Sequence, residues 1–274
     1  MPDGLMAVHK PAGWTSSDVV TKVRNELQRG FRRAIEEEQA TLTETANAAG
    51  GPASGHAGAQ QRNKRVKIKV GHGGTLDPMA TGVLVLGIGS GTKELEKYLQ
   101  GAKGYSAVGI LGSETDTLDS EGQETEAMEW SHVTRDALMQ ALEQFRGDIM
   151  QVPPMYSALR KDGKRLHELA RQGKVVERDA RPVTIYQLEA PAEGVALPSF
   201  ALNVQCSGGT YIRTLIADIA RALGTRGHMT SLVRTKQGPF GLEHCLDQQH
   251  WHFEQILAHL DKCNTHLRQN SKHS

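Results

Sequence analysis

The sequence has few cysteines, few aromatic residues and no long apolar run. Its 274 residues hold 3 cysteines and no Cys-x-x-Cys pair, so neither a disulfide framework nor a zinc site is expected. No apolar run approaches the roughly 20 residues that span a membrane. The first ten residues lack the layout of a secretory signal or of a transit peptide. We therefore expect a cytosolic or nuclear globular protein of one large or two modest domains.

Charge is almost balanced overall, at a formal net +1, but it is unevenly distributed. Residues 114–129 carry seven acids and no Lys or Arg, whereas residues 160–181 carry eight bases against four acids. Residues 226–240 carry three bases and no acid. A protein that grips a phosphate backbone with one face shows this polarity, and so does an ordinary patterned surface. The acidic block lacks calcium-loop spacing, so we expect a solvated loop turned away from any bound nucleic acid.

Apolar periodicity predicts strands and helices that interleave without a strict βαβ rhythm. The expected strands are 5–9, 83–88, 105–111, 183–188 and 200–206. The expected helices are 16–28, 93–99, 134–145, 166–172, 212–223 and 251–267. This order favours an α+β fold on a mixed sheet over a doubly wound parallel sheet.

The most informative segment is residues 70–84, which read Val-Gly-His-Gly-Gly-Thr-Leu-Asp-Pro-Met-Ala-Thr-Gly-Val-Leu. Its glycines let the backbone approach a bulky group closely, and Asp77 stands in a loop directly before an apolar strand. Taken alone, an aspartate in such a loop is more often a turn residue than a catalytic one. The whole segment, however, resembles the second motif of the TruB family of pseudouridine synthases.

Other segments resemble further motifs of the same family, in the same order. They are His9–Ser16, Gly101–Gly122, Gln151–Val183, Cys206–Arg213 and Leu232–Phe240. Several motifs in the right order make a chance match very improbable. The phrases Gly73-Gly74-Thr75 and Gly87–Lys93 look most like the eukaryotic stand-alone branch of the family, the Pus4/TRUB1 type.

The resemblance implies a pseudouridine synthase fold with a central mixed sheet, a thumb-loop insertion and a C-terminal helix. It places a catalytic domain in residues 1–250 and a helical tail in residues 251–274. Bacterial members carry a C-terminal PUA domain, and the 34 residues after Phe240 (274 − 240) are too few for one.

Residues 30–66 are expected to form a disordered insertion. Between Thr41 and Gln61 the only large apolar residue is Leu42, which is too little buried surface to offset the entropy of ordering. The basic end of this insertion either contacts RNA or belongs to a solvated linker.

The implied reaction is isomerisation of the T-loop uridine of tRNA, conventionally U55, to pseudouridine, with no cofactor and no metal. Asp77 would act at the flipped nucleotide, and Arg213 would pair with Asp77 and favour its charged form. Tyr105 would stack on the uracil. Sequence does not decide whether the aspartate attacks the sugar, adds to the ring or removes a sugar proton.

The resemblance also implies residues that hold the substrate. Leu232 would pack against the base, Lys10 would brace the catalytic loop, and His72 would sit beneath the RNA unless it is only a structural histidine. The thumb loop, residues 151–181, would contact the T-arm by shape and phosphate, unless it is an ordinary charged surface loop. Its candidate contacts are Arg160, Lys161, Lys164 and Arg165.

Two other functions compete with a stand-alone enzyme. One is the guide-RNA-dependent branch of the family, the dyskerin type, and the other is an RNA-binding tRNA-folding chaperone. We expect a monomer that acts on tRNA, with some mRNA uridines as further substrates. The expected compartments are the nucleus and/or the cytoplasm, with the mitochondrion as a further option.

Overall fold

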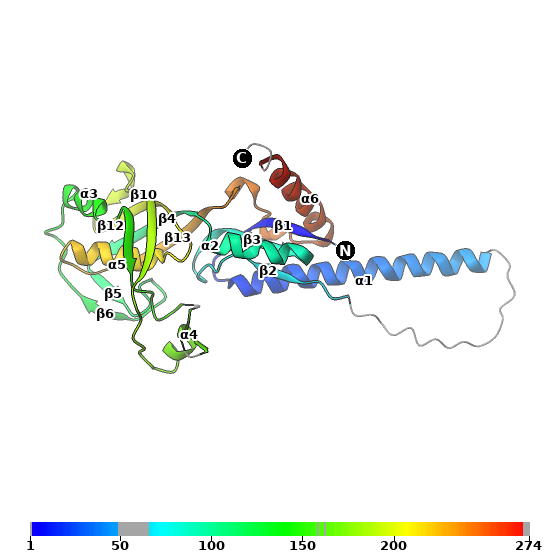
Figure 1. The fold of residues 1–274 in the computed structure, drawn as a ribbon, viewed down its shortest axis with the longest axis horizontal. Coiled ribbons are helices and arrows are strands. Elements are labelled where there is room, and N and C mark those ends of the chain that lie inside the picture. Colours follow the sequence, from blue (N-terminus) through cyan, green and yellow to red (C-terminus); the bar gives the residue numbers. More distant parts are fainter. Residues whose placement is uncertain (1, 49–65, 158, 162, 271–274) are drawn as a thin grey trace.

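The computed structural model describes residues 2–48, 66–157, 159–161 and 163–270. Its centre is a ten-stranded mixed sheet, drawn in Figure 1, in which seven strands follow the order β1-β3-β13-β4-β12-β10-β7. Strands β2, β11 and β14 pair with β3, β12 and β13. Neighbouring strands are antiparallel except β13 and β3, which are parallel. The expected α+β fold on a mixed sheet is confirmed.

The strands of this sheet include five that the apolar pattern did not predict, β2, β7, β11, β13 and β14. The bounds are β1 Gly4–Lys10, β2 Val70–His72, β3 Thr81–Ile88, β4 Lys103–Leu111, β7 Gly147–Gln151, β10 Arg181–Glu189, β11 Val195–Ala196, β12 Ser199–Cys206, β13 Gly227–Gln237 and β14 Phe240–Gly241. Strand β13 was missed because its buried positions include Arg234 and Gln237, which break the apolar alternation that a strand prediction needs.

The helices other than α4, which packs against the short strand β9, Lys164–Arg165, lie around two buried clusters. The helix bounds are α1 Ser16–Ala48, α2 Leu95–Gln100, α3 Arg135–Glu143, α4 Leu166–Ala170, α5 Ile212–Ala222 and α6 Phe253–Asn270. One cluster joins β1 and β3 to α1 and α6. The other joins α3 and α5 to β4, β10, β12 and β13. The loop between β2 and β3 belongs to the second cluster through Leu76 and Ala80, so it passes from one cluster to the other.

Helix α1 corrects the expected disordered insertion. It continues to Ala48 instead of ending near residue 28, and its distal part projects away from the sheet in Figure 1. Residues 34–45 are exposed, so the expectation that they bury little surface was right. They are nevertheless rich in Ala, Glu and Gln, which favour a helix without tertiary packing. Residues 66–69 are also ordered, with Val66 and Ile68 buried, and residues 49–65 lie outside the described part of the chain.

The acidic block, residues 114–129, is also more structured than expected. It contributes a two-stranded sheet made of β5, Ser113–Thr115, and β6, Glu124–Ala127. Glu114 pairs with Arg221, and Glu126 pairs with Arg226. Asp119 is buried, at 5% exposure. The block is therefore not simply a solvated loop.

The C-terminal helix was expected and is present as α6, which packs on β1 and α1. Trp251, just before this helix, is fully buried. Among the described residues, no helix has the length and apolar character needed to cross a membrane.

Candidate active site

The loop that carries Asp77 joins β2 to β3 and is held by the segment that follows β1. The Ser16 hydroxyl accepts from the Leu76 amide at 2.9 Å. The Gly13 amide donates to the Pro78 carbonyl at 2.9 Å. Both residues that flank Asp77 are thus tied to a distant part of the chain, which restricts the position of the aspartate.

The side chain of Lys10 also holds the loop that carries Asp77. This side chain is fully buried, and its Nζ donates to the carbonyls of Pro11, Trp14 and Pro78 at 2.9, 2.6 and 3.0 Å. Burial lowers the pKa of Lys10 to about 8, although the Asp77 carboxylate opposes this shift. These contacts are the bracing that the sequence led us to expect.

Arg213 lies in the first turn of α5 and faces Asp77. Its Nη2 donates to Oδ1 of Asp77 at 3.2 Å, and its Nε lies 3.0 Å from Oδ2. The side chain of Arg213 is 4% exposed and that of Asp77 is 29% exposed. The aspartate is therefore reachable from solvent, whereas its partner is enclosed. The expected pair is formed.

The guanidinium of Arg213 also joins two further loops to Asp77. Nη1 donates to the Thr117 carbonyl at 3.0 Å, and Nη2 donates to the Tyr156 carbonyl at 2.6 Å. A second carboxylate, that of Asp119, lies 3.9 Å from Nη1. Between Thr117 and Asp119, Leu118 has a φ of +62°. A branched side chain rarely takes this conformation, which the surrounding contacts must impose.

The charge state of Asp77 reflects two opposing effects. Burial raises the pKa of the Asp77 carboxyl, the Arg213 guanidinium lowers it, and the Asp119 carboxylate raises it again. Without Arg213, two carboxylates would share a poorly hydrated space, so the arginine is what makes ionised Asp77 tolerable.

Tyr105 and Leu232 lie on neighbouring strands β4 and β13 and belong to one buried cluster with Leu76 of the catalytic loop. Tyr105 is 8% exposed and Leu232 is 6% exposed. Burial raises the pKa of the Tyr105 phenol, and the guanidinium of Arg234 opposes this. The structure therefore brings together the aspartate, the aromatic ring and the apolar residue that were predicted from separate motifs.

His72 ends β2, two residues before the tight backbone of Gly74. Its Nδ1 lies 3.4 Å from the Gly74 amide. This contact supports a structural role for His72, and its predicted place beneath the RNA stays a prediction.

The four predicted thumb cations lie on a short hairpin, which we call the thumb hairpin, residues 160–165. Strand β8, Arg160–Lys161, pairs with β9, Lys164–Arg165, so that Arg160 opposes Arg165 and Lys161 opposes Lys164. Arg160 and Lys164 are exposed. Like charges directly opposite each other destabilise a strand pair, so the hairpin has the charge pattern of an anion-binding element.

The base of the thumb is fixed to the site. The Gln151 side chain donates to the Tyr211 carbonyl at 3.1 Å and accepts from the Tyr211 amide at 2.8 Å. Four residues before the thumb hairpin, Tyr156 accepts from Arg213. The chain that carries the hairpin cations is thus anchored to the partner of Asp77.

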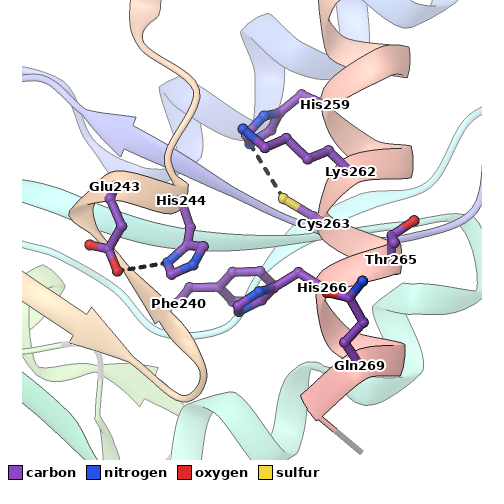
Figure 2. A pocket seen from close by; sticks show the side chains of 9 residues that line it. All are labelled: Phe240, Glu243, His244, His259, Lys262, Cys263, Thr265, His266 and Gln269. Atoms are coloured by element: carbon purple, nitrogen blue, oxygen red, sulfur yellow. Dashed lines mark hydrogen bonds and ion pairs between the residues drawn. The ribbon is translucent and has the colours of Figure 1, made fainter.

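A cavity of about 490 Å³ lies elsewhere, between α6 and residues 240–244. Figure 2 shows its histidines, and each has a partner: His244 pairs with Glu243, His259 contacts Cys263, and His266 contacts the Pro239 carbonyl. Among the described residues, no group of three or more His, Cys, Asp or Glu side chains is placed to hold a metal ion. The polar groups of this cavity thus stabilise the packing of α6.

Some residues of the site carried no role in the sequence analysis. Asp119 stands within a recognised motif, but the acidic block around it suggested solvent exposure. Arg234 was counted in a basic stretch expected to face phosphate, yet it is 1% exposed.

Solved structures share this fold. A chain from a Cbf5-Nop10-Gar1 complex matches 91% of this chain with a TM-score of 0.60 and 25% identity. A chain from an archaeal box H/ACA Nop10-Cbf5 complex matches 91% with a TM-score of 0.57 and 23% identity, which shows the fold alone. This chain spans about half the length of both, 53%.

Sequence relatives give the family. Residues 61–212 match the N-terminal domain of TruB family pseudouridylate synthases, and residues 213–269 match the C-terminal domain of tRNA pseudouridylate synthase B. Human pseudouridylate synthase TRUB1 is 43% identical over 96% of this chain and 69% of its own length. A tRNA pseudouridine synthase B of Aromatoleum aromaticum is 53% identical over 64% of this chain and 56% of its own length. The chain belongs to the TruB family of pseudouridylate synthases.

Proposed function

We propose that this protein is a tRNA pseudouridine synthase that isomerises the T-loop uridine, U55, to pseudouridine. The observation that carries the proposal is the solvent-accessible carboxylate of Asp77, paired with a buried Arg213, while the adjacent Leu76 belongs to one cluster with Tyr105 and Leu232. Relatives named tRNA pseudouridine synthase B support the choice of substrate.

The reaction needs the uridine outside the RNA stack, at a cost of a few kcal/mol. The Tyr105 ring returns about 1–3 kcal/mol by stacking on the uracil, and Leu232 closes the apolar side of the base. Asp77 in its ionised form acts at the nucleotide, and the uracil turns while it is held between these side chains. Arg213 keeps Asp77 charged and oriented.

The thumb hairpin recognises the T-arm by its phosphates. Four cations on six residues create a local charge that an RNA backbone neutralises, and binding releases counterions. Because the hairpin is anchored next to Arg213, contact with RNA is linked to the order of the active site. Recognition of this kind reads shape rather than base sequence.

The activity is tested with unmodified tRNA transcript, purified protein and no added cofactor or guide RNA. Pseudouridine is mapped by carbodiimide labelling and primer extension. The expected result is a stop at the T-loop uridine with wild type and none with Asp77→Asn. No stop with wild type, although the tRNA binds, would reject a stand-alone enzyme.

The two alternatives give different outcomes in that experiment. A guide-dependent enzyme converts the uridine only when guide RNA and partner proteins are added. The Cbf5 chain that shares this fold was solved in a complex with Nop10 and Gar1. A folding chaperone rescues misfolded tRNA equally well with Asp77→Asn. We favour the stand-alone reading because the full set of site residues is assembled within this chain.

The proposal extends to a monomer that works in the nucleus and/or the cytoplasm, with the mitochondrion as a further compartment and some mRNA uridines as further substrates. Sedimentation of the purified protein tests its oligomeric state. Transcriptome-wide mapping of pseudouridine in cells with and without the protein, separated by compartment, tests the rest.

A further inference from the structure

Arg234 lies on β13, between the strand that carries Tyr105 and the strand that follows the Asp77 loop. In the β13–β4 pair it is the partner of Tyr105, and in the parallel β13–β3 pair it is the partner of Gly82. The approach to Gly82 is so close that a Cβ on this glycine would lie 2.3 Å from the Arg234 carbonyl oxygen. The register of β13 shifts directly after Arg234, and such bulges often redirect a side chain near an active site.

The guanidinium of Arg234 contacts both halves of the candidate active site. Nε donates to the Val83 carbonyl at 2.7 Å, and Nη2 donates to the Gly74 carbonyl at 3.1 Å. Arg234 is also the cross-strand partner of Tyr105, and its guanidinium lowers the pKa of the Tyr105 phenol against the effect of burial. One planar group therefore connects the glycine turn of the Asp77 loop to the ring that faces the substrate.

This arrangement is costly for folding. Arg234 is 1% exposed, and Lys10 and Lys103 are buried nearby. Among the described residues, none of these three cations has a carboxylate within 4.0 Å. Burying a charge without a counterion is strongly unfavourable, and an apolar side chain of similar volume often serves stability as well or better. A role in packing alone does not explain a guanidinium here.

We propose that Arg234 is a positioning residue of the isomerisation, which fixes the Tyr105 hydroxyl relative to the Asp77 loop. This inference rests on the function proposed above. The detached uracil must turn between Asp77 and Tyr105, so a small error in their separation slows the reaction. A planar guanidinium holds its donors in a fixed fork, whereas a lysine ammonium is a compact charge on a flexible stem, so an arginine fixes the relative position of its partners more strictly.

The test compares Arg234→Lys, Tyr105→Phe and the double variant. Thr225→Val is a matched control, because it removes another buried hydrogen bond, from Thr225 to the Met128 carbonyl at 3.1 Å. Rates are measured in single turnover with enzyme in excess over tRNA transcript, together with the dissociation constant for tRNA and the urea unfolding midpoint.

We expect Arg234→Lys to slow the single turnover on the order of 100-fold, with tRNA affinity unchanged within about threefold. In the Tyr105→Phe background the same change should slow it further by less than about threefold, because the two residues act together. Thr225→Val should lower the unfolding midpoint and leave the rate within about twofold of wild type.

The proposal is overturned if Arg234→Lys slows the single turnover by the same factor in the wild-type and Tyr105→Phe backgrounds. It is also overturned if Thr225→Val slows the single turnover as much as Arg234→Lys does. The urea unfolding midpoints of wild type, the two single variants and the double variant form a second double-mutant cycle, which needs no turnover. If the changes in midpoint caused by the two single substitutions add up in the double variant, Arg234 and Tyr105 do not interact. Wild-type protein that converts no uridine rejects the proposed function, while the midpoint cycle still tests the contact.

Discussion

Asp77 and Arg213 come from opposite halves of the chain, and Nε of the arginine lies 3.0 Å from Oδ2 of the aspartate. The family model boundary at residues 212 and 213 falls between them, so the candidate site belongs to neither half alone. Arg213 also holds the carbonyls of Thr117 and Tyr156. One buried side chain thereby joins the Asp77 loop, the acidic block and the base of the thumb.

Asp77→Asn should abolish turnover and leave the fold intact. Burial raises the pKa of this carboxyl in the folded protein, so the ionised group costs stability, and a neutral amide removes that cost. Arg213 keeps its two carbonyl acceptors and the Asp119 carboxylate. We expect the free energy of unfolding to change by less than about 1 kcal/mol. Urea unfolding and pseudouridine mapping measure both effects, and a large loss of stability would contradict this account.

Loss of Arg213 should change both stability and pH dependence. Arg213→Gln leaves Asp77 and Asp119 without their cation, which should cost about 3–5 kcal/mol. The pKa of Asp77 is already raised by burial and is lowered by Arg213, so it rises further in the variant. Since the ionised form is needed, the acid limb of the pH–rate profile should move to higher pH. Arg221→Gln, which removes a half-exposed partner of Glu114, is the control and should leave the profile in place.

Lys10 should make stability depend on alkaline pH. Its folded pKa is lowered to about 8, whereas an unfolded lysine has a pKa of about 10.4. Between these values the unfolded state binds more protons, so this residue's contribution to stability rises with pH. Wild type should therefore gain stability relative to Lys10→Met, by up to about 3 kcal/mol across this window. Unfolding of both proteins at pH 7.5 and 9.5 tests the sign, and a constant difference would refute it.

Gln237→Met should loosen the catalytic loop. The fully buried Gln237 side chain donates to the Gly73 and Tyr98 carbonyls at 2.7 and 3.3 Å and accepts from the Val85 amide at 3.1 Å. Methionine fits the volume but leaves three backbone groups unsatisfied, at about 1–3 kcal/mol for each. Hydrogen exchange of residues 73–85 should speed up. Unchanged exchange there would show that Gln237 does not brace the loop.

Neutralising the thumb hairpin should weaken RNA binding in a salt-dependent way. Arg160→Ala and Lys164→Ala remove exposed cations, and each should make the slope of log Kd against log salt shallower by about 1 if it contacts a phosphate. Lys236→Ala, on the exposed side of β13, is the control for charge alone. An unchanged slope in the hairpin variants would mean that the hairpin does not bind phosphate.

Most residues of the candidate site were predicted from the sequence motifs. Asp77, Arg213 and Tyr105 were named from sequence, and the structure brings their loops and strands together. The resemblance to the family also implied that Lys10 braces the loop, and its contacts with the Pro11, Trp14 and Pro78 carbonyls are consistent with this. Arg234, Gln237 and Asp119 were not assigned roles. Polar residues in a sequence suggest solvent, and only the packing around them shows that these three are inside.

The sequence by itself indicated the family and the mixed sheet and named Asp77 as the candidate catalytic carboxylate, because glycine turns, apolar strands and an ordered set of motifs are local properties. Tertiary structure decided which charges are buried and which are paired. It placed Arg213 against Asp77, and it buried Arg234, which sits three residues from Gln237 in a strand that the apolar pattern did not predict. The reason is physical: the cost of an enclosed charge depends on neighbours from distant parts of the chain, which spacing along the sequence does not specify.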